Sequence, residues 1–432
     1  MRNGFAGLDA CVHCGFCLQA CPTFLVTGDE ADSPRGRIEL IRALERGELA
    51  PSDPDLQLHL DRCLGCRGCE PVCPSGVQYG HGLEAARALL AHTTRVPWLA
   101  RAALRTLTTP GISKIVYWLA RLLRRTGLPR RLAGWGRLRF AMGMLAATQP
   151  DARTAGRPDA RTAAANDTAA KWRRGGGKRR SPPSISPPPH APPSAALLFR
   201  GCVMQGLFAH VHEATIRTLA TNGYAVGEVA GQVCCGALHA HAGLLDHARA
   251  LAHRNVAAFG EGDEPIVVNS AGCGAWMKEY GRLDDGGERF AARVRDVTEL
   301  LAAGGDPVAG APLDLHVAYD PPCHLLHAQR VAGPPARLFA AIPLLELVDV
   351  AGAAECCGSA GLYTLLQPQF SRAVLRAKLG HLREAAPEIV ATGNPGCLMQ
   401  IGAGLLAAGV PATVAHPVEL LDAAYAAAGH YE

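Results

Sequence analysis

Apolar residues recur at helical spacing in several stretches of the chain, and shorter continuous apolar runs fall between them. RGRIELIRALERG and GLEAARALLAH predict short helices near the N-terminus, and KIVYWLARLLRR predicts an amphipathic helix farther along. From residue 195 onward, apolar runs of strand length alternate with helical patterns. This alternation predicts α/β units with parallel sheets.

The α/β region contains one pattern twice. Each copy runs from a strand ending in a single cysteine, through a helix, to a Cys-Cys-Gly step. A second helix then leads to another strand that we expect to end in a cysteine. The steps from single cysteine to pair are 32 and 33 residues, and those from pair to last cysteine are 38 and 40. Since ligands gather at the carboxyl ends of parallel strands, these thiols are candidate ligands. They are Cys202, Cys234, Cys235 and Cys273 in the first copy, and Cys323, Cys356, Cys357 and Cys397 in the second.

These patterns predict an α+β multidomain chain. We expect a cysteine-rich α-helical domain at 1–94 and a basic helical connector at 95–147. Residues 148–194 are rich in Pro, Gly and Arg and cannot bury enough apolar surface to fold, so we expect a disordered linker. The two repeated α/β domains follow at 195–309 and 310–432.

The net charge of +5 is unevenly distributed. Residues 95–180 hold 20 Lys and Arg against three Asp, whereas the rest of the chain is acidic, with 23 against 35. The Trp, Leu and Arg of the connector suit an interfacial surface or a partner's groove, and packing against a neighbouring domain is the alternative. The basic RRGGGKRR has no interleaved aromatic residues, so we expect no nucleic-acid binding.

Sixteen cysteines in a chain of 432 residues favour a metal or cluster protein over a disulfide scaffold, which suits small secreted chains. The first residues lack the apolar run of a signal peptide, and no stretch of 18 uncharged apolar residues occurs. We therefore expect a cytoplasmic protein with no membrane span.

The N-terminal domain carries the most specific motif. CVHCGFCLQACP and CLGCRGCEPVCP both follow C-x2-C-x2-C-x3-C-P, the bacterial ferredoxin pattern, in which the fourth cysteine ligates the other cluster. A four-cysteine zinc site needs only paired C-x2-C units, so zinc is the weaker alternative. We predict two [4Fe–4S] clusters, one held by Cys11, Cys14, Cys17 and Cys73 and the other by Cys63, Cys66, Cys69 and Cys21.

The adjacent cysteines of the repeats are poor candidates for a disulfide with each other, because such a bond is strained. We expect each pair to place two thiolates on one face of a metal, with Gly236 or Gly358 allowing close backbone approach. Four thiols per repeat suit a cubane, a modified cluster or zinc, and buried structural cysteines are the alternative. His239, His241, His324 and His327 are further candidates for ligation, for proton relay, or for simple backbone bonding.

The chain resembles the iron–sulfur subunit of glycolate oxidase, also called glycolate dehydrogenase. The resemblance covers 1–94 and 195–432, and the connector and linker resemble nothing specific. Similar repeats occur in heterodisulfide reductases, lactate-utilisation proteins and the anaerobic glycerol-3-phosphate dehydrogenase subunit. The stretches that carry the resemblance are ACVHCGFC, PRGRI at 34–38, HLDRCLGCRGCEPVCPSGVQY at 59–79, AGCGAWMKEYG at 271–281, LHAQ at 326–329 and CCGSAG at 356–361.

The resemblance implies an electron-transfer subunit without catalytic residues of its own. FAD-containing partner subunits would oxidise glycolate to glyoxylate, and electrons would pass through this chain toward a membrane quinone. It also implies a hetero-oligomer bound peripherally at the inner face of the cytoplasmic membrane. The sequence agrees with this, since we find no Gly-rich dinucleotide fingerprint.

Two alternatives for the electron-transfer function remain open at this point, and a zinc-scaffold protein is the last alternative. One is the equivalent subunit for lactate or glycerol-3-phosphate oxidation, because the partner sets the substrate. The other is an enzyme like heterodisulfide reductase, whose repeats end in C-x2-C. Here Trp276 and Gln400 stand where those last cysteines would be, which argues against it.

Overall fold

The computed structural model of the protein describes residues 5–93, 96–154 and 194–431. Its N-terminal part is helical, and most of its helices begin with a proline in their first turn. The side chain of Ser33 accepts a hydrogen bond from the Gly36 amide at the start of α2, and Asp53 caps α3 in the same way. The helices are α1 (Pro22–Thr27), α2 (Pro34–Arg46), α3 (Pro54–Arg62) and α4 (Tyr79–Thr93), with short 3-10 turns at Ala6–Leu8 and Glu30–Asp32.

Two parallel four-stranded sheets follow, with strand orders β2-β1-β3-β4 and β6-β5-β7-β8. The two sheets therefore have one topology used twice, which confirms the predicted pair of α/β repeats. The first repeat contains β1 (Ser194–Phe199), α10 (Val203–Leu207), α11 (Ala209–Thr221), β2 (Tyr224–Glu228), α12 (Ala237–His241), α13 (Leu245–Phe259), β3 (Ile266–Val268), α14 (Ala271–Met277), α15 (Gly287–Arg293), β4 (Val294–Asp296) and α16 (Val297–Ala303). The second contains β5 (Leu315–Tyr319), a π-helical turn (His324–Ala328), α17 (Gly333–Ala340), β6 (Leu345–Leu347), α18 (Tyr363–Leu366), α19 (Pro368–Ala385), β7 (Ile389–Ala391), α20 (Pro395–Ala408), β8 (Thr413–Ala415) and α21 (Pro417–Ala428).

All four strands that we expected to end in a cysteine are shorter than the sequence pattern suggested. β1 ends at Phe199, before Cys202, and β5 ends at Tyr319, before Cys323. β3 and β7 stop before the last cysteines, so Cys273 and Cys397 lie in the first turns of α14 and α20. The cause is local, because Ser270 and Asn394 are extended N-cap residues after which the chain turns into a helix. Both cysteines still lie beyond the carboxyl ends of their strands.

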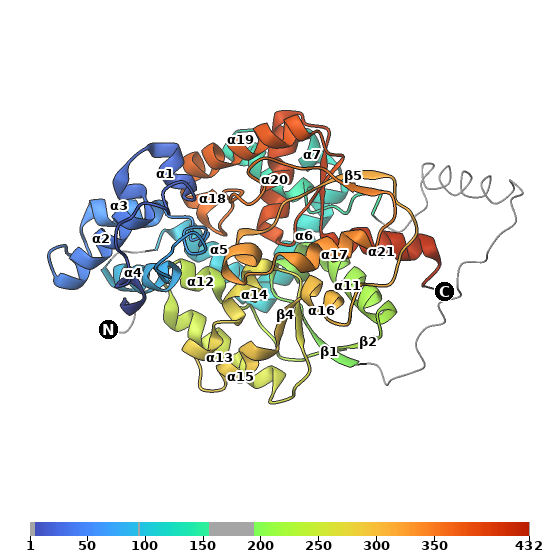
Figure 1. Ribbon diagram of the computed structural model, residues 1–432, viewed down its shortest axis with the longest axis horizontal. Helices are drawn as coiled ribbons and strands as arrows, with labels where there is room; N and C mark the ends of the chain where they lie inside the picture. Colours follow the sequence, from blue (N-terminus) through green and yellow to red (C-terminus); the bar gives the residue numbers. More distant parts are fainter. Residues whose placement is uncertain (1–4, 94–95, 155–193, 432) are drawn as a thin grey trace, which may run out of the picture.

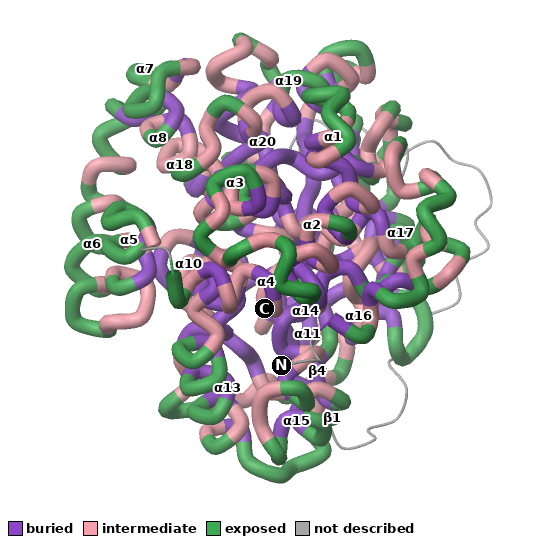
Figure 2. The backbone as a smooth tube through the Cα atoms, turned by 90° about the vertical axis from the view of Figure 1, so that its left-hand side faces the viewer, coloured by how far each residue is buried: buried purple, intermediate pink, exposed green. Residues whose placement is uncertain are grey.

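The connector forms four helices, α5 (Trp98–Thr108), α6 (Pro110–Arg125), α7 (Leu128–Leu132) and α8 (Arg137–Ala146). Helix α8 packs on α20, where a Cβ added to Gly143 would lie 3.1 Å from the Cβ of Ala403. Figure 2 shows α5, α6, α7 and α8 along one side of the molecule, with α6 exposed over most of its length.

The start of the predicted disordered linker is in fact packed. Thr148 and Thr154 are buried, and Arg153 donates a hydrogen bond to the hydroxyl oxygen of Thr413 at 2.6 Å. Asp151 pairs with Arg153 at 2.8 Å, so the polar groups of this turn are satisfied against the second repeat. Disorder was therefore the wrong prediction for 148–154, and Ser194 already belongs to β1. Residues 155–193 of the predicted linker lie outside the described residues.

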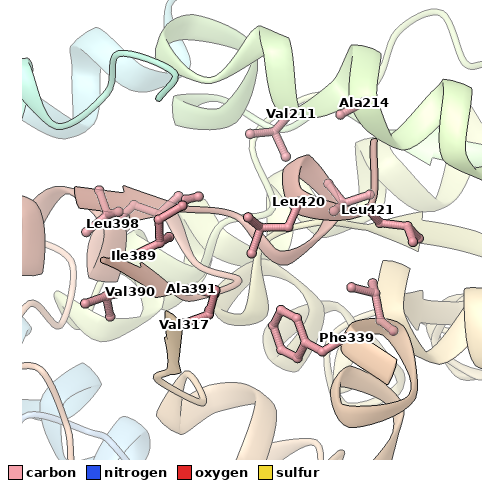
Figure 3. Close-up of a cluster of buried hydrophobic side chains, with 14 of the residues drawn as sticks. Val211, Ala214, Val317, Phe339, Ile389, Val390, Ala391, Leu398, Leu420 and Leu421 are labelled. Carbon is pink, nitrogen blue, oxygen red and sulfur yellow. The ribbon is translucent and has the colours of Figure 1, made fainter. Parts of the chain in front are cut away.

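The largest buried core joins the two repeats. Figure 3 shows Val211 and Ala214 of α11 facing Leu420 and Leu421 of α21, with Phe339 below them. An ion pair between Arg217 and Asp422, with 2.6 Å between nitrogen and oxygen, lies beside this contact. In Figure 1 the helices α1 to α4 lie at one end, next to α12 of the first repeat and α18 of the second.

No helix within 5–93, 96–154 or 194–431 combines the length and the apolar character that crossing a bilayer requires.

Candidate metal centres

The two N-terminal cysteine motifs have the same backbone conformation. His13 and Gly15 have positive φ angles of 55° and 87°, and Gly65 and Arg67 have φ angles of 63° and 60°. These residues occupy the same two positions of the two motifs. A left-handed conformation costs free energy for a non-glycine residue, so its persistence at His13 and Arg67 points to a functional constraint. In each motif the left-handed residues bend the loop around a candidate metal centre.

The cysteines of this domain line two small cavities, of about 30 and 20 Å³. Cys69 borders both cavities, so the two candidate centres are neighbours. The first cavity is lined by Cys11, Cys14, Cys17 and Cys73 besides Cys69, and the second by Cys21, Cys63 and Cys66 besides Cys69. Around each cavity the structure thus brings together the four thiols that the sequence pattern groups.

A buried cation lies against the second of these sets. Arg37 is fully buried and donates hydrogen bonds to the Thr23 hydroxyl at 3.1 Å and to the Cys21 sulfur at 3.8 Å. It also pairs with Asp32, 3.3 Å away. A cation beside thiolates compensates the negative charge that a thiolate-ligated cluster carries. The donor set and its surroundings therefore fit an anionic cluster.

The distances between the cysteine sulfurs indicate which kind of metal site the thiols suit. All sixteen cysteines are described and none forms a disulfide. No three of them have their sulfurs all within 4.8 Å of one another, because the one group of that kind in the described residues is Asp29, Asp32 and His59. Tetrahedral zinc with Zn–S bonds of about 2.3 Å needs sulfurs roughly 4 Å apart. No three cysteine sulfurs therefore have the compact mutual spacing of a four-cysteine zinc site.

In each α/β repeat the adjacent cysteines turn to different partners. The sulfur of Cys234 lies 3.5 Å from that of Cys202, whereas the sulfur of Cys235 lies 3.3 Å from that of Cys273. The second repeat has the same plan, with Cys357 and Cys397 3.3 Å apart and Cys356 hydrogen-bonded to Cys323. The hydrogen bonds from Cys202 and Cys235 lower the pKa of the Cys234 thiol well below its usual value. The pair thus gathers the four thiols of its repeat.

The glycine after each pair has both a conformational and a packing role. Gly236 and Gly358 have φ angles of 91° and 82°, which L side chains rarely adopt. A Cβ on Gly358 would lie 2.5 Å from the carbonyl oxygen of Ser371 on α19, and one on Gly236 would lie 3.1 Å from that of Ala248 on α13. The close approach that the structure shows is between each glycine and the backbone of a helix, and the predicted approach to a metal stays a prediction.

Both repeats face one cavity. It has a volume of about 240 Å³, and all eight cysteines of the repeats line it. The repeats meet at its edge, where the amide of Gly272 donates to the Asn394 side chain at 3.1 Å. The sequence predicted two separate sites, and the structure joins them in one chamber.

The N-terminal domain reaches this chamber through Cys66. Cys66 packs in one cluster with Cys356, and hydrogen bonding to the Cys356 thiol lowers the pKa of Cys66. The pKa of Cys356 is raised, chiefly by hydrogen bonding to Cys323 and Cys357. Leu64 and Tyr363 pack around the contact, and the Tyr363 hydroxyl donates to the carbonyl oxygen of Arg62 at 2.7 Å. One candidate cluster ligand therefore touches the cysteine pair of the second repeat.

The four predicted histidines divide into two kinds. His324 lies 3.5 Å from the Cys323 sulfur, and its ring centroid is 5.7 Å from that of His241, so these two line the chamber. His327 instead bonds the carbonyl oxygen of Ala354 at 3.1 Å, and His239 stacks on His247. Burial lowers the pKa of His241 to about 3, so its ring is neutral at neutral pH.

Two supporting residues escaped sequence reasoning. The Tyr280 hydroxyl donates to the Cys235 carbonyl oxygen at 2.7 Å, and Asn255 donates to the Cys234 carbonyl oxygen at 3.2 Å. Tyr280 lies in AGCGAWMKEYG, one of the stretches that carry the resemblance, whereas Asn255 has only its spacing from the pair as a signal. Trp276 is buried in the core of the first repeat, and Gln400 hydrogen-bonds Ser371 at 2.8 Å. Neither side chain therefore replaces the absent fifth cysteine as a metal ligand.

The regions that contain the candidate metal centres match known protein domains. Residues 7–77 match the 4Fe-4S dicluster domain, and residues 196–278 and 317–402 both match the cysteine-rich domain. The chain is 33% identical to the probable glycolate oxidase iron-sulfur subunit of Bacillus subtilis over 97% of this chain and 94% of that protein. It belongs to the glycolate oxidase iron–sulfur subunit family.

Other relatives are consistent with this. The glycolate oxidase iron-sulfur subunit of Escherichia coli is 32% identical over 96% of this chain and 94% of its own length. Lactate utilization protein A of Geobacillus kaustophilus is 29% identical, over 52% of this chain and 98% of its own. As a member of the glycolate oxidase iron–sulfur subunit family, the chain is an iron–sulfur electron-transfer subunit of a hetero-oligomeric oxidoreductase.

Proposed function

We propose that this chain relays electrons from FAD-containing subunits, which oxidise glycolate to glyoxylate, toward a membrane quinone. The N-terminal thiols would hold two [4Fe–4S] clusters, with the ligand sets predicted above, and the eight thiols of the repeats would hold a further cluster. Clusters bound there would supply one-electron transfer. The chain itself positions thiols, buries them and excludes water.

The contact between Cys66 and Cys356 carries the proposal. It joins the N-terminal centres to the chamber, so the candidate centres form one series. The series runs from the cavity at Cys14, past Cys69, through Cys66 to the second repeat, and across the chamber to the first. Sites in a row, with no substrate-binding motif beside them, support a conduit more than a catalyst.

The exposed end of the series supports electron entry there. Cys14 is exposed, and its neighbours Val12 and Phe16 are 68% and 67% exposed. An apolar surface around a redox centre suits docking of a partner subunit. We propose that the flavoprotein docks over these residues.

The test uses the complex, tagged through this chain and purified anaerobically. Added glycolate should bleach the iron–sulfur absorbance, whereas lactate and glycerol-3-phosphate should not. A complex bleached by lactate alone would keep the relay and replace the substrate. A complex that none of the three reduces would refute the proposed function.

Docking can be tested with Phe16→Asp, which places a charge in the apolar surface. The variant should lose the flavoprotein on co-purification while keeping its iron content. Leu25→Asp, at a residue 52% exposed on α1, is the matched control. Equal retention of the flavoprotein by both variants would exclude entry at Cys14.

A further inference from the structure

Helix α6 is held to the molecule by one face only. Tyr117 packs so tightly on α10 that a Cβ on Gly206 would lie 2.4 Å from its ring. Arg124 donates to the carbonyl oxygens of Thr148 and Leu207, at 2.6 and 3.2 Å. Yet none of the residues of α6 is buried. Its other face is therefore directed away from the protein.

That other face is apolar. Ile115 is 63% exposed, Trp118 is 58% exposed, and Leu119 and Leu122 continue the row at helical spacing. Trp98, at the start of the neighbouring α5, is 70% exposed. A contiguous apolar surface of this kind on a protein marks an interaction site.

The charge around this face has a single sign. Residues 96–150 contain ten Lys and Arg and no Asp or Glu. On α6, Lys114, Arg121 and Arg125 are exposed and flank the apolar row. Exposed Trp and Leu beside basic residues is the composition of a helix that lies in the interface of an anionic membrane.

Charge also distinguishes the possible occupants. The chain's own segment 155–193 carries eight basic residues against two acidic ones, and the same face of a second copy is basic as well. Both would be repelled by this face, whereas an anionic lipid surface attracts its basic residues. An acidic protein would satisfy the charge, but the two exposed Trp fit a lipid interface better.

We propose that the connector lobe, α5–α8 (residues 98–146), seats the chain on an anionic membrane through the exposed face of α6 and Trp98. This inference deepens the proposed function, and it rests on that function only for the claim that the electron acceptor is a membrane quinone. Leu107 of α5 and Met144 of α8 line the eight-cysteine chamber. A membrane on this lobe would therefore lie beside the chamber, where a lipid-soluble acceptor collects electrons.

The test measures binding of the full-length, cluster-containing chain to vesicles. It should float with vesicles of phosphatidylglycerol and phosphatidylcholine, much more than with phosphatidylcholine alone, and added salt should release it. Arg121→Glu with Arg125→Glu should weaken binding by more than about tenfold. Ile115→Ser with Trp118→Ser should weaken it at all salt concentrations.

The control is Arg249→Glu with Arg289→Glu, at exposed arginines on α13 and α15 away from the lobe, which should bind like the wild type. Arg124 is left unchanged, because it anchors α6. Iron content and circular dichroism must match the wild type, which excludes misfolding.

Three outcomes would overturn the inference: no preference for phosphatidylglycerol, lobe variants that bind like the wild type, or variants that lose the flavoprotein instead of the vesicles. The last would make the lobe a subunit interface. Bleaching by glycolate in detergent tests the relay separately, and lobe variants should retain it.

Discussion

Single residues determine how thiols are gathered in this protein. Sequence-adjacent cysteines point to different partners, because Cys234 meets Cys202 while Cys235 meets Cys273. The glycine that follows turns the backbone into a conformation that brings the pair against a helix. One dipeptide therefore brings together thiols from two segments that are distant in the sequence.

Replacing Gly358 by Ala should destabilise the second repeat through both strain and overlap. The left-handed φ costs about 1 kcal/mol, and the contact with the Ser371 carbonyl adds about 1–3 kcal/mol. Gly409→Ala is the matched control, since Gly409 has a φ of 65° but nothing within 4 Å of its added Cβ. Urea denaturation should rank the two variants in this order, and equal losses of stability would contradict the close approach.

Arg37 should raise the reduction potential of the cluster that Cys21 helps to hold, because it is a buried cation beside that sulfur. Arg37→Gln should shift this potential to more negative values in a redox titration followed by electron paramagnetic resonance. Arg37→Lys should restore part of the shift. Arg62→Gln also removes a partner of Asp32, 3.0 Å away, without a cysteine contact, and should shift the potential less.

At the scale of elements, the N-cap of helix α21 supports a residue that lines the chamber, Asn269. His416 is buried at the N-cap of α21, where its Nδ1 accepts from the Val418 amide at 3.2 Å and its Nε2 donates to the Asn269 carbonyl oxygen at 3.2 Å. Both bonds require a neutral ring. Burial lowers the pKa of His416 to about 3.

Acid should therefore weaken this cap. Because the pKa of His416 is lowered on folding, its stabilising effect is complete above the unfolded value of about 6.5 and is lost as the pH falls toward about 3. The loss is about 1.4 kcal/mol per pH unit. His416→Asn keeps a capping oxygen, so its unfolding free energy should fall less steeply between about pH 6 and 4. Parallel curves would show that the ring is already charged in the folded state.

The elements themselves were largely predictable, because their signals are local. The period of apolar residues located α2, α4, α6, α13 and α19. The ends of β3 and β7 were not predictable from that pattern, since NSAGC and TGNPGC have no long apolar side chains to separate strand from helix. The composition of 148–194 likewise hid the packed turn at Asp151 and Arg153, whose partners are Glu388, just before β7, and Thr413 of β8.

At the scale of the molecule, the N-terminal domain is locked to the first repeat by charge. Arg67 is hydrogen-bonded to Glu279, which also pairs with His81 at 3.4 Å and with Arg282 at 3.0 Å. The neighbouring Arg67 and His81 hold the pKa of Glu279 at about 2, despite burial. This carboxylate is therefore ionised and central to the contact.

Glu279→Gln should loosen the N-terminal domain, because it removes the charge partner of the largely buried Arg67 on the first repeat and leaves this arginine paired only with Glu70 of its own domain, at a cost of up to about 3 kcal/mol. Hydrogen exchange should rise at the Cys63–Cys69 loop and at α14. Glu39→Gln breaks a surface pair with Arg42 in the same domain and should leave exchange there unchanged. Unaltered exchange in both variants would mean that the apolar contact alone holds the domains.

The sequence predicted each set of thiols, but it did not predict that the sets lie next to one another. The ligand sets follow from spacing, which is local. The shared chamber and the Cys66–Cys356 contact depend on how the N-terminal domain and the two repeats pack together, and the local periodicity of the sequence does not record this packing.

The burial of the second repeat's cysteines has a consequence for biogenesis under the proposed function. Cys356, Cys357 and Cys397 are 5%, 3% and 4% exposed, and Leu64 and Cys66 of the N-terminal domain pack in one cluster with Cys356. A cluster at Cys356 would have to be assembled before Cys66 packs beside this thiol. The ribosome releases the N-terminal domain first, so this domain would dock only after the repeats have folded and been loaded. The part of the chain that is made first would then be the last to close.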